Sequence, residues 1–150
     1  MEEITFARAA AADLPAVRAL LEGCGLPVAD LEERHLEHFI VCRAAGRIAG
    51  AVGLEPLGDV GLLRSLAVAP ELRGRGLAHD LWLRAEEAAR GRGLRRLYLL
   101  TTTAEPLFAR WGFQRVDRND VPPAIRATAE FASLCPDTAA VMAKDGDPSP

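Results

Sequence analysis

The stretch LLRSLAVAPELRGRGLA, residues 62–78, constrains the fold more than any other part of this sequence. An apolar run typical of a strand leads into a loop that contains Gly74 and Gly76, and the loop opens directly into a helical pattern at Leu77. Such a junction leaves several backbone N–H groups free at the positive end of a helix dipole. The sequence therefore predicts an anion site here, suited to a pyrophosphate.

The side chains around the two glycines fit the same interpretation. Glycine leaves the backbone accessible to phosphate oxygens, and Arg73 and Arg75 can add charge-assisted contacts. The spacing excludes two familiar phosphate loops, G-x-x-x-x-G-K-[ST] and G-x-G-x-x-G. The alternative is a glycine-containing turn with two solvated arginines.

The remaining periodicity predicts one α/β domain with a sheet of mixed strand direction. Gly46 and Gly58 mark the short turns of an antiparallel meander, and the polar segment 30–37 is either a short helix or a loop. Predicted strands cover residues 4–8, 38–42, 48–54, 60–68, 96–101, 113–116 and 138–144, and predicted helices cover residues 14–22, 77–90 and 105–111, with another starting near Pro122 or Pro123.

Composition excludes several classes of function. The chain of 150 residues has the length of one domain, and its formal net charge of −3 argues against nucleic acid or an anionic membrane as a partner. No apolar run is long enough to span a membrane and no signal peptide precedes the first strand, so we expect a cytoplasmic protein. Cys24, Cys42 and Cys135 are widely spaced without a C-x-x-C pair, which predicts reduced thiols and no metal site.

The loop resembles the R/Q-x-x-G-x-G/A signature of the GCN5-related N-acetyltransferases (GNAT), here from Arg73 to Ala78. The likeness extends to the later buried strand, the short helix and the Gly112-Phe113 step. It implies a GNAT domain over residues 1–144, with a cleft for acetyl-CoA between splayed strands. The polar, proline-containing residues 145–150 predict a disordered tail. The implied cofactor-binding residues are Leu66, Ala67, Val68, Arg73, Gly74, Arg75, Gly76, Leu77, Ala78 and Phe108, and the N–H of Val68 would stabilise the oxyanion.

The proton carriers of the family are missing from this sequence. Leu62 and Leu63 stand where many members carry a base Glu, and Phe108 stands where many carry an acid Tyr. Glu55 is the leading substitute for the base, although a solvated turn carboxylate is an equal interpretation. Tyr98 is a candidate acid, and its alternative is a core residue with a satisfied hydroxyl.

Arg64 is a further departure from the family. By strand alternation it shares a face with Leu62, Leu66 and Val68, so its guanidinium is expected to point into the acceptor cleft and clamp a carboxylate or another oxyanion. The alternative is a side chain that extends to the sheet edge. Ser65 and Thr101 are expected beside the same acceptor.

Residues 122–136, together with the segments around Glu55 and Arg64, resemble the small acetyltransferases of bacterial arsenic-resistance operons, which are similar to amino-acid N-acetyltransferases. This resemblance implies a small amino-acid-like amine as acceptor. A single Cys135 is more typical of packing than of arsenic ligation. Two hypotheses stay open, an N-acetyltransferase and a non-catalytic acyl-CoA-binding module, and the chain is expected to be a monomer or a homodimer.

Overall fold

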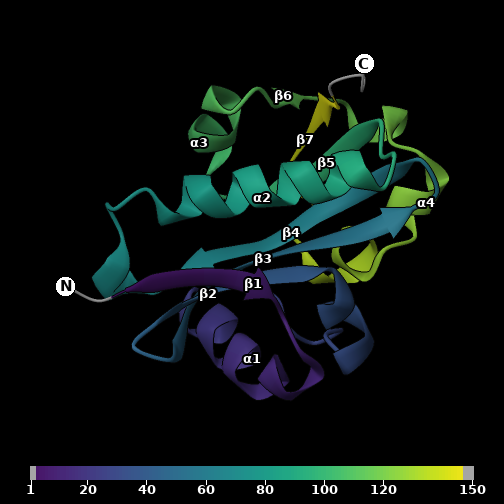
Figure 1. The fold of residues 1–150 in the computed structure, drawn as a ribbon. Helices are drawn as coiled ribbons and strands as arrows, with labels where there is room; N and C mark the ends of the chain where they lie inside the picture. The colour runs from purple at the N-terminus through teal and green to yellow at the C-terminus, as the bar shows by residue number, and fades with distance from the viewer. Residues whose placement is uncertain (1–2, 147–150) are drawn as a thin grey trace.

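The computed structural model describes residues 3–146. Within these residues, seven strands form one sheet with helices on both faces (Figure 1). The strands are β1 (Ile4–Arg8), β2 (Phe39–Ala44), β3 (Arg47–Leu57), β4 (Val60–Val68), β5 (Arg96–Thr101), β6 (Gln114–Arg115) and β7 (Ala140–Asp145). The α-helices are α1 (Leu14–Gly23), α2 (Leu77–Gly91), α3 (Glu105–Arg110) and α4 (Pro123–Arg126), and the shorter helical turns are η1 (Ala11–Asp13), η2 (Glu33–His38), η3 (Pro70–Leu72), η4 (Arg118–Asp120) and η5 (Glu130–Leu134).

The sheet has the strand order β1-β2-β3-β4-β5-β7-β6. The strands from β1 to β4 pair antiparallel, β4 pairs parallel with β5, and β7 pairs antiparallel with β5 and β6. The predicted meander and the mixed strand direction are therefore confirmed. β3 runs through Leu57, beyond the predicted end at residue 54, and the turn lies at Gly58 and Asp59. Pro56 is tolerated since β2 pairs with β3 only as far as Gly53, so no ladder bond on that side is lost.

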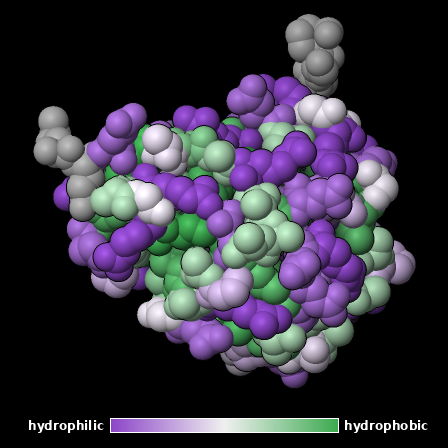
Figure 2. All heavy atoms as spheres, turned by 60° about the horizontal axis from the view of Figure 1, so that its bottom comes forward, coloured by the Kyte–Doolittle hydropathy of each residue, from purple (hydrophilic) through white to green (hydrophobic). Residues whose placement is uncertain are grey.

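Two apolar layers hold the helices on the sheet. On one face, α2 packs Leu77, Leu81 and Trp82 into a core that includes Phe108 of α3. On the other face, α1 buries Val17 and Leu21, and Ile125 of α4 joins a third cluster under β5 and β7. Figure 1 shows α2 along one face of the sheet and α1 on the other. Figure 2 shows a hollow on the molecular surface where hydrophobic residues are exposed and polar residues surround them.

A bulge in β4 shapes the centre of the sheet. The register against β3 changes between Ala51 and Gly53, where two residues of β4 oppose one of β3, and Ser65 has a φ of 59°. A bulge bends the strand and inverts the alternation of side chains beyond it. Pairing between β4 and β5 ends with Leu62 opposite Tyr98, so the two strands separate where the bulge begins.

The C-terminal third differs in detail from the sequence pattern. The helix expected near Pro122 or Pro123 begins at Pro123 but ends at Arg126, and the π-helical turn η5 follows. The last strand reaches Asp145, one residue beyond the expected domain boundary, and residues 147–150 of the expected tail lie outside the described residues. Within residues 3–146, no helix is both long and apolar enough to cross a membrane.

Candidate active site

A cleft of about 660 Å³ opens where β4 and β5 separate. Its walls come from β4, the loop from Arg73 to Gly76, the start of α2, the end of β5, α3 and the segment around η5. Most of the residues expected at the site line this cleft, namely Arg64, Ser65, Leu66, Ala67, Val68, Arg73, Gly74, Gly76, Leu77, Ala78, Thr101 and Phe108. Glu55, Arg75 and Tyr98 are absent from its described lining.

The glycine loop has the geometry of an anion site. Gly74 and Gly76 have φ angles of 83° and 79°, and no atom lies within 4 Å of where a Cβ would stand on either residue. Gly76 is also the N-cap of α2, a helix of 15 residues, so its dipole and first N–H groups face the open loop. Arg73 lines the cleft and its Nε donates to the carbonyl of Val68 at 3.2 Å, whereas Arg75 is exposed outside the lining.

The backbone of Val68 is turned toward the gap between the strands. The N–H of Ala69 donates to Ala49 of β3 at 2.8 Å, and Val68 stands opposite Gly50. Groups in an antiparallel ladder alternate in direction, so the N–H and C=O of Val68 point away from β3, toward the side where β5 has already separated. The carbonyl of Val68 accordingly meets Arg73 and the thiol of Cys24. The N–H of Val68 has the direction that an oxyanion donor requires.

The opposite wall is largely apolar. Phe108 of α3 is buried against Trp111 and Phe113, and it faces the cleft without a hydroxyl. Thr101 ends β5, and its Oγ1 accepts the N–H of Ala104 at 2.9 Å, which fixes the entry into α3. Leu66 packs into the same core as Phe108.

Arg64 lies in a buried cluster of three carboxylates. Its Nη1 and Nη2 donate to Asp30 at 2.5 and 2.9 Å, and Nη1 also donates to Glu55 at 3.0 Å. Nε donates to Ser65 Oγ at 2.9 Å and stands 3.2 Å from Glu130 Oε2. The side chain of Arg64 has no exposed surface. Arg64 lines the cleft, but Asp30 already occupies its fork, so the fork is not open for the predicted clamp on an acceptor carboxylate.

The bulge also corrects the expected alignment of Arg64. Leu66 and Val68 pack into the core on the α2 face, whereas Leu62 belongs to the cluster with α4 on the other face. Two residues of β4 oppose one of β3 between Arg64 and Ala67, so strict alternation fails there. Arg64 shares a face with Leu62 but not with Leu66 and Val68.

Glu130 is a residue of the cleft that the sequence patterns did not indicate. Glu130 lines the cleft from η5, is buried, and receives the thiol of Cys135 at 3.8 Å. Burial raises the pKa of Glu130 to about 7; Arg64 opposes the rise, and the charges of Glu55 and Asp30 add to it. For Asp30, burial alone would raise the pKa, but the hydrogen bonds and charge of Arg64 hold it below its usual value. Glu130 therefore exchanges a proton near neutrality, whereas Asp30 stays ionised there.

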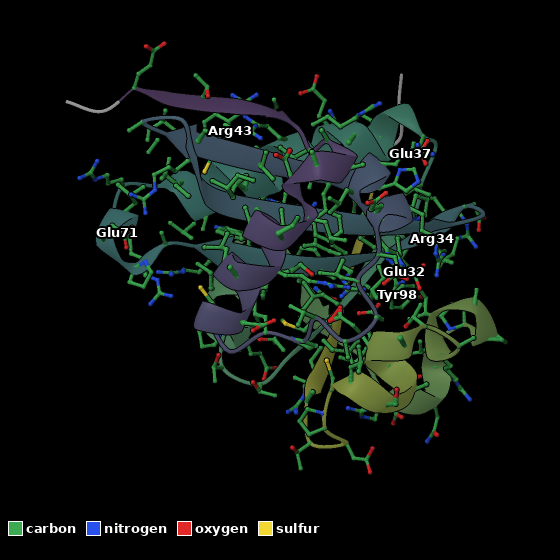
Figure 3. All side chains as sticks on the ribbon, turned by 90° about the horizontal axis from the view of Figure 1, so that it is seen from below. Glu32, Arg34, Glu37, Arg43, Glu71 and Tyr98 are labelled. Atoms are coloured by element: carbon green, nitrogen blue, oxygen red, sulfur yellow. The ribbon has the colours of Figure 1, made fainter. Side chains whose placement is uncertain are left out.

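The two expected proton carriers lie elsewhere. Glu55 is in β3 opposite Leu62, and its Oε2 accepts a hydrogen bond from Arg64, so it is neither a solvated turn carboxylate nor a residue of the cleft. Tyr98 is buried in the cluster under α4, where its hydroxyl accepts from Arg96 Nε at 3.0 Å. Figure 3 shows Tyr98 well apart from Glu71 in the turn η3, which precedes the glycine loop.

The sequence profile of the Acetyltransferase (GNAT) family matches residues 9–113. The chain belongs to this family. The match confirms the predicted family and its fold. In sequence, the chain is 39% identical over 101 residues to an amino-acid acetyltransferase of Pseudomonas paraeruginosa, covering 66% of this chain and 23% of that protein.

Other relatives agree with the family assignment. An amino-acid acetyltransferase of Neisseria meningitidis is 28% identical over 127 residues, which are 79% of this chain and 29% of that protein. The chain therefore spans less than a third of the length of these relatives.

Among solved structures, N-acetylglutamate synthase from Neisseria gonorrhoeae, complexed with coenzyme A and L-arginine, superposes with a TM-score of 0.80 at 25% identity, covering 95% of this chain and 33% of that one. Rv2747 of Mycobacterium tuberculosis, crystallised with CoA, gives a TM-score of 0.78 at 24% identity, covering 94% of this chain and 98% of that one. Both likenesses support the fold.

Proposed function

We propose that this protein transfers an acetyl group from acetyl-CoA to the primary amine of a small, amino-acid-like acceptor. The observation that carries the proposal is the cleft between β4 and β5, which has an open glycine loop at one end and the N–H of Val68 turned into the gap. The family assignment and the amino-acid acetyltransferases among its relatives support the same reaction.

The residues present fit acetyl-CoA. Gly74, Gly76 and the start of α2 would hold the pyrophosphate through backbone N–H groups, and Arg73 would add a positive charge beside them. Backbone groups of β4 that lack a partner in β5 would pair with the pantetheine amides. The thioester supplies the activated acetyl group, and the N–H of Val68 stabilises negative charge on its oxygen as the amine attacks.

The acceptor is recognised mainly through its amine. Three carboxylates surround the guanidinium of Arg64 beside the cleft. Their excess negative charge favours the cationic amine of the acceptor over its carboxylate at this end of the cleft. Arg64 keeps one N–H on Nη2 that makes no hydrogen bond to the described residues, which is enough for a single contact but not for a bidentate clamp.

The narrower resemblance to proteins of arsenic-resistance operons extends the acceptor class to phosphinic and arsenical analogues of amino acids. The cytoplasm stays the predicted compartment. A monomer or a homodimer stays the predicted assembly.

The test is a screen of amino acids, their amides, and their phosphinic and arsenical analogues, with release of the free CoA thiol as the readout. Turnover of at least one small amine, with mass spectrometry showing the N-acetyl product, supports the proposal. The alternative function is a non-catalytic acyl-CoA-binding module, which the leucines at 62 and 63 and Phe108 favour because they replace the family's proton carriers. Tight binding of acetyl-CoA without turnover of any amine would establish that alternative.

A further inference from the structure

Glu130 is a buried carboxylate that the structure leaves incompletely satisfied. Its side chain is only 8% exposed, and Oε2 accepts no hydrogen bond from the residues that the structure describes. Arg64 Nε lies 3.2 Å from Oε2, but its hydrogen is directed to Ser65 Oγ. A buried carboxylate oxygen without a donor is costly, and such groups are uncommon outside functional sites. Since Glu130 also lines the cleft, this oxygen is open to a donor that enters with a ligand.

The position of Glu130 within the cleft defines that ligand. Glu130 contacts β4 at Arg64, close to the point where β4 separates from β5. The glycine loop lies at the other end of β4, after Val68. Arg64 and Val68 are four positions apart in the chain, and the bulge takes up one of them, so about three strand steps, roughly 10 Å at the usual rise, separate their backbones. The carboxylate therefore lies at the end of the cleft away from the phosphate loop. With the pyrophosphate held at the loop, this end is where we expect an acceptor amine to reach the thioester.

We propose that Glu130 is the general base of the acetyl transfer, an inference that rests on the proposed function. The carboxylate takes one proton from the acceptor ammonium, and the neutral amine forms the C–N bond at the thioester carbon. The C–S bond breaks, the second proton of the nitrogen goes to the departing thiolate, and the products are the N-acetylated acceptor and free CoA. Glu130 returns its proton to solvent when the product leaves, so one proton is released per turnover.

The groups that face Glu130 suit this role. From β4 and β3 it faces Arg64 and Glu55, from the loop after α1 Asp30, and from its own segment Cys135. Burial raises the pKa of Glu130 to about 7, so the carboxylate is a stronger base than an exposed one and is still ionised in much of the protein at neutral pH. Burial and the nearby Glu130 raise the pKa of Cys135 to about 11, so the thiol stays neutral and donates.

The experiment measures kcat/KM for an acceptor amine from pH 5 to 9 in wild type, Glu130→Gln and Glu55→Gln. Wild type should rise with pH through an ionisation near 7 and level off. Glu130→Gln should lose roughly a hundredfold or more at pH 7.5 and lack that ionisation, with acetyl-CoA affinity unchanged by calorimetry. Glu55 does not line the cleft but its charge raises the pKa of Glu130, so Glu55→Gln should keep the plateau and move the rise to lower pH.

Two controls separate a chemical role from a structural one. Glu37→Gln removes an exposed carboxylate of η2 and should leave the profile unchanged. For acceptors whose amines are already neutral at the assay pH, Glu130→Gln should lower kcat/KM much less than for strongly basic acceptors. Full activity of Glu130→Gln with a wild-type profile, or no shift in Glu55→Gln, would overturn the inference while the acetyltransferase proposal stands. Absence of turnover in wild type would instead contradict the proposed function. Should Glu130→Gln fail to fold, the shift in Glu55→Gln decides alone.

Discussion

Replacing Glu130 by Gln should change how the stability of the protein depends on pH. Burial raises the pKa of this carboxyl from 4.5 to about 7 in the folded protein. The folded state therefore holds a proton that the unfolded state releases between these values, and stability falls as pH rises through this window. Each unit of pKa difference corresponds to about 1.4 kcal/mol, so at pH 8 the ionised carboxylate lowers the free energy of unfolding by on the order of 3 kcal/mol. Glutamine has nearly the same shape and carries no charge, so the variant lacks this penalty.

The assay is urea unfolding at pH 5, 6, 7 and 8, comparing Glu130→Gln with wild type. The free energy of unfolding should be similar at pH 5, and the variant should be more stable by about 3 kcal/mol at pH 8. Glu37→Gln, an exposed change on η2, should follow wild type throughout. Parallel curves for Glu130→Gln and wild type between pH 5 and 8 would refute the argument, because they would mean that the carboxyl titrates alike in the folded and unfolded states.

Three further changes test other parts of the structure. Gly76→Val and its control Gly93→Val both place a branched side chain at a φ above 70° in open space, so each variant should lose about 1–2 kcal/mol of stability. Only Gly76→Val should weaken acetyl-CoA binding in calorimetry, by roughly tenfold or more. Phe108→Tyr should leave kcat/KM unchanged or raise it, with CoA affinity retained; a large loss would reveal a packing role in α3. Arg64→Ala leaves three carboxylates without their cation and should cost about 3–5 kcal/mol in denaturant unfolding, against about 0.5 kcal/mol or less for the exposed Arg34→Ala.

Local patterns were enough to predict most of the fold. The alternation over residues 4–8 and the apolar run 96–101 coincide with β1 and β5, and Gly46 and Gly58 lie in the predicted turns. The helix predicted over residues 77–90 begins at Leu77 as expected and ends at Gly91, one residue later. These features depend on neighbours within a few residues, which is the range over which periodicity carries information.

The glycine loop was also predictable, because its chemistry is local. Backbone N–H groups, two glycines and a helix start all lie within a few residues, and the structure places Gly74 and Gly76 at positive φ on the wall of the cleft. Arg75 is the exception, since the turn directs it to solvent while Arg73 bonds to Val68. Neighbouring residues in a loop have no fixed period, so the sequence could not separate the two arginines.

The bulge at Ser65 was not visible in the sequence. A non-glycine residue at a φ of 59° is uncommon, and nothing in the run LLRSLAV marks it. One added residue inverts the faces of a strand beyond it. The prediction that Arg64 shares a face with Val68 therefore failed through a single backbone torsion. Glu130 was missed for a related reason, because the turn of η5, with Cys135 N–H bonded to the Glu130 carbonyl, does not follow the α-helical period.

The Arg64 cluster shows why the chemistry of this site is less predictable than its fold. Its carboxylates come from the loop after α1, from β3 and from η5, which are 34, 9 and 66 positions away from Arg64 in the chain. No spacing rule connects such distant residues. A guanidinium with 0% exposure is stable only with partners of opposite charge, and three carboxylates leave an excess of negative charge beside the cleft. Arg64 and Asp30 neutralise each other in close contact, which leaves Glu55 and Glu130. Of these two, Glu130 lines the cleft and has an oxygen without a donor among the described residues. The same arginine that the sequence suggests as an acceptor clamp therefore acts, in the structure, on the carboxylate that meets the acceptor.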